Sequence, residues 1–130
     1  MTGKTYEYAA TVDKVVDGDT VHLVLTQTYE LDIDFGFNII DHIAFQKTAH
    51  QDIRLYGINA PEMHGATAAA GLAAKNELIR LLGLGTLRVV IIKQDKYGRW
   101  LGSIYVTPPD GAEVNVNQAM IDGGFAIVYV

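Results

Sequence analysis

Short extended runs dominate this chain, and only one long stretch has the composition of a helix. Residues 67–82 are rich in alanine and leucine, which favour helix. The other apolar runs are β-branched and aromatic and end at turn residues, as strands do; they cover 6–11, 20–25, 29–33, 39–45, 51–58, 87–92 and 100–106. Too few helices remain for alternating strand–helix–strand units. The order therefore predicts a mainly β (α+β) fold, a small barrel with helices packed on it.

Two local patterns refine this expectation. In the predicted long helix, one stripe is expected to face the core, namely Ala69, Leu72, Ala73, Asn76, Ile79 and Leu82, with only the asparagine polar. A short second helix is predicted after Asn115, which can cap it with Gln118 as capping-box partner. Residues 125–130 are expected to be extended.

Composition limits the organisation of the chain and its partners. With 130 residues, 49% of them apolar, we expect one domain over 1–130. Cysteine is absent, which excludes disulfides and thiolate metal sites. No apolar run is long enough for a membrane span, and the first residues do not resemble a signal peptide, so we expect a cytoplasmic protein, a monomer without a membrane partner. The net charge of −5 argues against a broadly basic nucleic-acid-binding surface.

Three segments concentrate polar groups at predicted strand ends. They are Asp17-Gly18-Asp19-Thr20, in which the glycine is expected to take positive φ, residues 54–62, and Asp95-Lys96-Tyr97-Gly98-Arg99. Each has an ordinary interpretation when taken singly: a hairpin turn, a strand with a surface ion pair, and a surface turn. Arg54 shares strand parity with Tyr56 and Ile58, which suggests that it points into a cleft or is paired.

Taken together and in this order, the three segments resemble the staphylococcal nuclease-like (thermonuclease) family. The resemblance extends to the alanine-rich helix and to residues 116–126, and covers the chain apart from about 26–52, which we expect to be an enlarged hairpin. It implies a five-stranded OB-fold barrel with two or more packed helices. It also implies a calcium-dependent nuclease, or one using another divalent cation, that hydrolyses phosphodiester bonds of DNA or RNA.

Position by position, the resemblance implies a metal site. Asp19 matches the principal metal carboxylate, and Asp17 matches an acid that acts through water. Ala60 stands where the family uses a backbone carbonyl. Asn59 departs from the family pattern, which has an aspartate ligand there. An amide oxygen can still coordinate calcium but brings no charge, so metal affinity or activity is expected to fall. Alternatively, Asn59 only caps the turn before Pro61.

The resemblance also implies a catalytic set. Arg54 and Arg99 match two phosphate-binding arginines, Glu62 matches the acid that activates the attacking water, and Tyr97 is assigned to substrate binding. His64, two residues past the glutamate, is either a substrate contact or a surface histidine.

Two questions stay open at this level. The acids of the 26–52 segment, Asp32, Asp34 and Asp41, either supply a replacement ligand or form a solvated face. The alternative to a nuclease is a catalytically degenerate OB-fold module that binds single-stranded nucleic acid or a protein.

Overall fold

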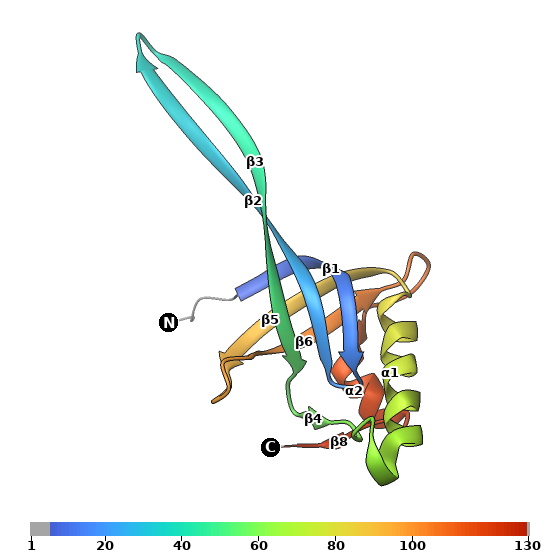
Figure 1. Cartoon of the computed structure of the whole chain (residues 1–130). Helices are drawn as coiled ribbons and strands as arrows, with labels where there is room; N and C mark the ends of the chain where they lie inside the picture. The colour runs from blue at the N-terminus through green and yellow to red at the C-terminus, as the bar shows by residue number, and fades with distance from the viewer. Residues whose placement is uncertain (1–5, 130) are drawn as a thin grey trace, which may run out of the picture.

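The computed structural model describes residues 6–129, and its main feature is a β-barrel with one long arm (Figure 1). The long strands are β1 (Tyr6–Asp17), β2 (Thr20–Gly36), β3 (Ile39–Leu55), β5 (Thr86–Gln94) and β6 (Trp100–Thr107). The short strands are β4 (Ile58–Asn59), β7 (Val114–Asn115) and β8 (Ile127–Val128). A 3₁₀ turn (Gly65–Thr67) precedes helix α1 (Ala68–Leu82), and helix α2 (Val116–Asp122) follows β7.

The barrel closes through a single parallel pairing. Strands β3, β2, β1, β5 and β6 follow one another in antiparallel order, and β3 then pairs in parallel with β6. This contact joins Ile53 to Trp100 and Leu55 to Gly102, which completes a ring of five strands. The predicted mainly β fold, a five-stranded barrel with packed helices, is confirmed.

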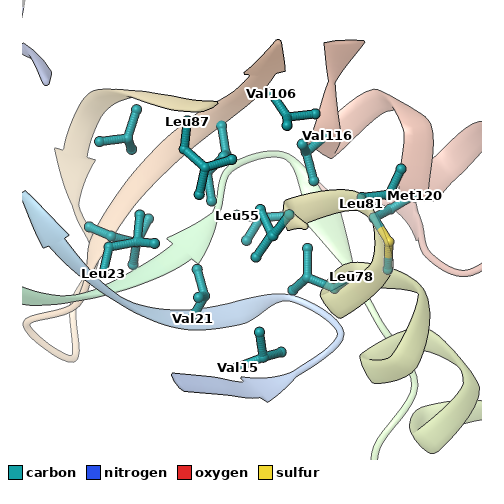
Figure 2. Packing of buried hydrophobic residues seen from close by; sticks show 14 of the residues in the cluster. Val15, Val21, Leu23, Leu55, Leu78, Leu81, Leu87, Val106, Val116 and Met120 are labelled. Atoms are coloured by element: carbon teal, nitrogen blue, oxygen red, sulfur yellow. The ribbon is translucent and has the colours of Figure 1, made fainter. Parts of the chain in front are cut away.

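The core lies inside the barrel and under the two helices. Alternate residues of β2 point inward, so Val21 and Leu23 are fully buried together with Ile53 of β3. Leu78 of α1 and Met120 of α2 close the other side of the core, as Figure 2 shows. This apolar interior fixes the strand ends that carry the polar residues discussed below.

The buried face of α1 differs from the predicted stripe. Its buried residues are Gly71, Ala74, Leu78, Leu81 and Leu82, whereas Leu72 and Ile79 are about half exposed and Asn76 is exposed. The predicted stripe was wrong apart from Leu82, because an alanine-rich helix is similarly apolar on several faces. The buried face is the one that contains Gly71, where a Cβ would lie 2.4 Å from the carbonyl oxygen of Glu62.

The short C-terminal elements hold the end of the chain near the site. Asn115 caps α2 as predicted, accepting a hydrogen bond from the Gln118 amide at 3.2 Å. The Gln118 side chain does not complete a capping box, because it donates to Asp122 instead. Within the predicted extended segment 125–130, β8 pairs with β4; Val130, like residues 1–5, lies outside the described residues.

Strands β2 and β3 continue far beyond the barrel. β1 pairs with β2 only as far as Thr26, and β3 pairs with β6 only from Ile53. Among residues 6–129, the segment 27–47 therefore pairs only within itself and projects as the arm in Figure 1. Two continuous 17-residue strands replace the shorter runs expected there, because cross-strand pairing continues through polar positions.

Within residues 6–129, neither helix is long and apolar enough to cross a bilayer.

Candidate active site

The turn between β1 and β2 forms the centre of a polar cleft. Asp19 is only 7% exposed, and its Oδ2 accepts a hydrogen bond from the Ala60 amide at 2.8 Å. Thr20 donates to its Oδ1 at 3.2 Å. A backbone amide 41 positions away thus fixes one carboxylate at the mouth of the barrel.

Gly18 permits this turn for a reason other than the predicted one. Its φ is not in the left-handed region. A Cβ at this position would instead lie 2.6 Å from the Cβ of Ala74 and 2.8 Å from that of Ala60. Glycine is required because α1 and the segment after β4 both pack directly against the turn.

Arg54 joins the first two polar segments. Its Nη1 lies 3.0 Å from Asp19 Oδ2, with both side chains about one-tenth exposed. Its Nη2 donates to Asn59 Oδ1 at 3.2 Å, and its guanidinium carbon lies 5.6 Å from the centre of the Tyr129 ring. The arginine is both paired and directed into the cleft, the two outcomes that its strand parity suggested.

The two aspartates of the turn have opposite protonation tendencies. Burial disfavours ionised Asp19, but hydrogen bonds from Asp17 and the Ala60 amide, together with Arg54, outweigh burial and lower its pKa. Burial raises the pKa of Asp17, and the neighbouring Asp19 raises it further. Ionising both therefore costs free energy, which a bound cation would offset.

The second acidic position is open to solvent. Glu62 follows Pro61 at the entrance to α1, and its side chain is 75% exposed. Its Oε2 lies 3.1 Å from His64 Nε2, so this histidine contacts the glutamate. Within the described part of the chain this exposed contact is the one that holds the Glu62 carboxylate, so the side chain can move toward a substrate.

Arg99 reaches the cleft from the β5–β6 turn. Asp95 Oδ1 accepts hydrogen bonds from the Tyr97 and Arg99 amides, both at 2.9 Å, and Asp95 Oδ2 pairs with Arg99 Nε at 2.9 Å. Gly98 has φ +86°, which only a glycine adopts easily. The turn thus holds Arg99 through its amide and its Nε.

All but one of the predicted site residues line one cavity of about 440 Å³. They are Asp17, Asp19, Arg54, Asn59, Ala60, Glu62 and Arg99. The exception is Tyr97, which is 72% exposed outside the lining and lies beside Arg99, whose guanidinium carbon is 5.5 Å from the ring centre.

The donor set suits a hard cation in type but is low in charge. Asp17, Asp19 and Asn59 can each offer an oxygen ligand, the type that calcium and magnesium prefer. Among residues 6–129, no three histidine, aspartate or glutamate side chains converge on one position. Ala60 contacts Asp19 through its amide, and the role of its carbonyl stays a prediction.

Sequence reasoning missed three supporting residues: Asp95, Asn117 and Tyr129. Asn117 is 5% exposed; it accepts from the Ile104 amide and donates to the carbonyls of Tyr56 and Gly102. It thereby ties α2 to the end of β3 next to Arg54. The sequence signal that could have identified Asn117 is an amide side chain between the apolar positions of a helix only seven residues long.

The fold and the site define a class of small closed β-barrel proteins with a cleft of carboxylates and arginines. The model of one family, described as staphylococcal nuclease homologue, matches residues 52–130. The chain belongs to the staphylococcal nuclease homologue family. Asp17 and Asp19 lie outside the matched segment, and the fold is what brings them to Arg54.

Curated relatives agree with this membership. An "Uncharacterized endonuclease" of Escherichia coli O157:H7 is 39% identical over 77 residues, which cover 59% of this chain and 46% of that protein. A "Probable staphylococcal-like nuclease CAN1" of Oryza sativa subsp. japonica is 38% identical over 77 residues, covering 59% of this chain and 21% of that protein. The chain therefore spans less than half the length of these relatives.

One solved structure resembles the whole fold. The human TDRD1 extended Tudor domain, crystallised with a symmetrically dimethylated peptide, has a TM-score of 0.61 and 9% sequence identity, with 99% of this chain and 93% of that chain covered. At this identity the likeness concerns the fold alone.

Proposed function

We propose that this protein is a metal-dependent nuclease that hydrolyses phosphodiester bonds of DNA or RNA with calcium or another divalent cation. The observation that carries the proposal is the single cavity that brings the Asp19–Arg54 pair together with Glu62 and Arg99. Family membership and the endonuclease-named relatives support the same reaction class.

In this proposal the metal ligands are Asp19, Asn59 and the Ala60 carbonyl, with Asp17 acting through water. A bound divalent cation supplies positive charge that polarises a phosphoryl oxygen. Asp19 is prepared for this role because its pKa is lowered, so it is ionised at neutral pH without a metal. Asn59 reduces the negative charge of the set, which is expected to weaken metal affinity.

The two arginines bind and orient the scissile phosphate. Arg54 contacts Asp19 through Nη1 and donates from Nη2 to Asn59. A phosphate oxygen either competes for these donors or accepts hydrogen bonds from the remaining N–H groups. Arg99 is held at Nε by Asp95, so both of its terminal nitrogens can fork onto the phosphate. Their charges stabilise the negative charge that develops on the phosphoryl oxygens during attack.

Glu62 is the general base in this mechanism. It accepts a proton from a water molecule whose oxygen forms the new bond to phosphorus, while the bond from phosphorus to the leaving ester oxygen breaks. Its exposure and its single histidine contact allow the carboxylate to turn toward the cleft. In this proposal Tyr97, whose ring lies beside Arg99, stacks on a base next to the cleaved phosphate.

The experiment is cleavage of single-stranded DNA and RNA oligonucleotides with calcium, with magnesium or manganese, and with chelator. Glu62→Gln should reduce the rate on the order of 10²–10⁴-fold with little effect on stability, because the side chain is exposed. Glu113→Gln is a matched control, since Glu113 pairs with Arg88 outside the cleft. An unchanged rate in Glu62→Gln would remove this residue from the mechanism.

Calorimetric calcium titration tests the metal site independently of activity. Asp19→Ala should abolish binding, and Asn59→Asp should strengthen it because a second charged ligand replaces the amide. Equal affinities for the wild type and Asp19→Ala would contradict the site.

A second candidate function is a degenerate OB-fold module that binds single-stranded nucleic acid or a protein without cleaving it. The observation in its favour is the low charge of the ligand set within the described residues. Absence of product with every ion, together with cleavage by Asn59→Asp, would identify a lapsed nuclease.

A further inference from the structure

The hairpin arm, residues 27–47, exposes an unusual amount of apolar surface. Eight of its large apolar side chains are 40–90% exposed: Tyr29, Leu31, Phe35, Phe37, Ile39, Ile40, Ile43 and Phe45. Soluble monomers rarely expose apolar patches larger than a few hundred Å², and a two-stranded hairpin alone is only marginally stable in water. The arm therefore needs a partner surface.

The arm has one apolar face and one polar face. Directly paired residues of antiparallel strands point to the same side. The pairs Tyr29–Phe45, whose rings stack with centroids 5.7 Å apart, and Leu31–Ile43 form the apolar face. The pairs Glu30–Ala44, Asp32–His42 and Asp34–Ile40 belong to the other face, which is polar apart from Ala44 and Ile40, and the Asp32 and His42 side chains are in contact there. The other seven exposed apolar side chains are the ones available to the apolar face.

The apolar face continues the inner surface of the barrel. Val21, Leu23 and Leu25, which are buried, share strand parity with Tyr29 and Leu31. Where the arm leaves the barrel, a cavity of about 570 Å³ opens at its base, lined on one side by Leu25, Tyr29, Lys47, Ala49 and Gln51. Ile91 and Trp100 line its other side. The core of this protein is thus open at the base of the arm.

The tip of the arm is strained. Phe37 and Asn38 have φ of 55° and 63°, and the phenylalanine is 90% exposed. A left-handed conformation costs a bulky L-residue about 1–2 kcal/mol, and in an isolated chain this ring gains no contact in return. A buried position for Phe37 in a partner would supply that contact.

The charge of the arm disfavours nucleic acid as the partner. Residues 26–48 contain four carboxylates, Glu30, Asp32, Asp34 and Asp41, against a single lysine, Lys47. Phosphates would be repelled, since nucleic-acid binding depends on lysine and arginine contacts.

We propose that the apolar face of the arm binds the same face of a second copy of this chain, forming a two-fold symmetric dimer. The charges on this face are self-complementary under that symmetry. Asp41, paired with Ile33, lies toward the tip, and Lys47, paired with Gln27, lies at the base. Six residues of strand separate them by roughly 20 Å, so they cannot pair within one chain.

A two-fold axis between Ile43 and Phe45 satisfies both charges. With the two arms antiparallel and face to face, Asp41 of each copy lies opposite Lys47 of the other, and the Tyr29–Phe45 stacks meet near the axis. The same register carries Phe37 to the level of Gln51, where the cavity at the base of the arm lies. Each tip is thereby directed to the open end of the other barrel.

The surface on offer is sufficient for such a dimer. Seven side chains that each leave on the order of 100 Å² in water provide roughly 700 Å², close to the roughly 800 Å² that one partner contributes to a standard interface. Dimerisation would replace the monomer expected from the sequence.

Sedimentation equilibrium of the full chain over a concentration series is the first test. The wild type should dimerise reversibly, and Ile43→Asp, at the axis, should be monomeric at every concentration. Circular dichroism should show the same barrel in both, because Ile43 lies outside the core. A wild type that is monomeric throughout the series would overturn the proposal.

A charge exchange tests the register. Asp41→Lys and Lys47→Asp should each raise the dimer dissociation constant about tenfold or more by placing like charges opposite each other. The double variant Asp41→Lys/Lys47→Asp should restore it. Glu30→Lys, on the polar face, and Lys14→Asp, on β1, are controls for the change in net charge.

Each outcome of the exchange has a clear meaning. A double variant that is as weak as the single variants would overturn the antiparallel register. Cleavage of short oligonucleotides by these variants is a separate measurement, so failure of the dimer and failure of the proposed nuclease are distinguishable.

Discussion

The two ends of the β2–β3 strand pair differ in which side chains are buried and which are exposed. At the barrel end, Asp19 and Arg54 are charged and nearly buried. In the hairpin arm, Leu31 and Phe45 of the same two strands are apolar and about half exposed. Each end departs from the usual pattern of apolar residues inside and charged residues outside.

The two ends show different conditions under which such a departure is tolerated. A buried ion pair costs desolvation free energy and is tolerated where its hydrogen bonds are satisfied, as Asp19 is by the Ala60 amide and Arg54. An exposed apolar face costs solubility and is tolerated where another surface covers it. Departures from the usual pattern of this kind are expected at functional positions.

The largest effect is expected from Arg54→Ala at the barrel end. The Asp19 carboxylate would stay buried beside Asp17 without its counter-charge, so the free energy of unfolding should fall by about 3–5 kcal/mol. The proposed cleavage should slow on the order of 10²–10³-fold because one phosphate donor is lost. Chemical denaturation and single-turnover cleavage measure the two effects.

Arg80→Ala is the matched control for this change. Arg80 pairs with Glu77 on the surface of α1, so its removal should leave the unfolding free energy almost unchanged. If Arg54→Ala were as mild as Arg80→Ala, the buried pair would contribute nothing special and the contrast between the two ends would fail.

Two leucines on the same face of β2 provide the next test. Leu23 is fully buried and Leu31 is 50% exposed, although they share strand parity. Leu23→Ala should cost about 2–5 kcal/mol of unfolding free energy. Leu31→Ala should cost less than about 1 kcal/mol at concentrations where the chain is monomeric. Equal costs, measured by urea denaturation, would mean that the arm is already covered within one chain.

The glycines of the two turns should respond to substitution for different reasons. Gly18→Ala places a methyl group against Ala74 and Ala60 and should cost about 1–3 kcal/mol through overpacking. Gly36, with φ +82° and open space around it, should lose about 1 kcal/mol on change to alanine through backbone strain alone. Asparagine, which tolerates positive φ, should relieve the cost at Gly36 but not at Gly18; relief at both positions would refute the steric explanation.

Much of the fold could be predicted from local sequence because the strands have β-branched runs and clear turn residues. The Asn115 cap, for example, forms where it was predicted. The buried face of α1 could not be predicted, because it is chosen by the close approach of Gly71 to the Glu62 backbone, a contact made only in the folded chain. The continuous strands of the arm could not be predicted either, because acidic residues interrupt their apolar runs.

The candidate site, like the fold, could be predicted only in part. Resemblance to the family proposed the residues, and the barrel brings all of them except Tyr97 to one cavity. What sequence reasoning missed is how they are held: Asp95 behind Arg99, Tyr129 beside Arg54, and Asn117 beneath the end of β3. Tyr129 and Asn117 come from segments that are distant from Arg54 in the chain. Asp95 belongs to a turn, and the hydrogen bonds of that turn cannot be predicted from composition.

The smallest effect concerns pH and the turn that holds Arg99. Burial alone would raise the pKa of Asp95, but hydrogen bonds from the Arg99 and Tyr97 amides and from the Arg99 guanidinium outweigh it and lower the pKa. Because the folded pKa lies below the unfolded value of 3.8, this stabilisation is fully present above pH 3.8 and is lost as the pH falls through the folded pKa. Amide hydrogen exchange at Tyr97 and Arg99 should therefore quicken in that acidic range, after correction for its intrinsic pH dependence. Asp95→Asn should lose the pH dependence because its amide does not titrate. The same acid-dependent step in Asp95→Asn would show that another carboxyl group controls the turn.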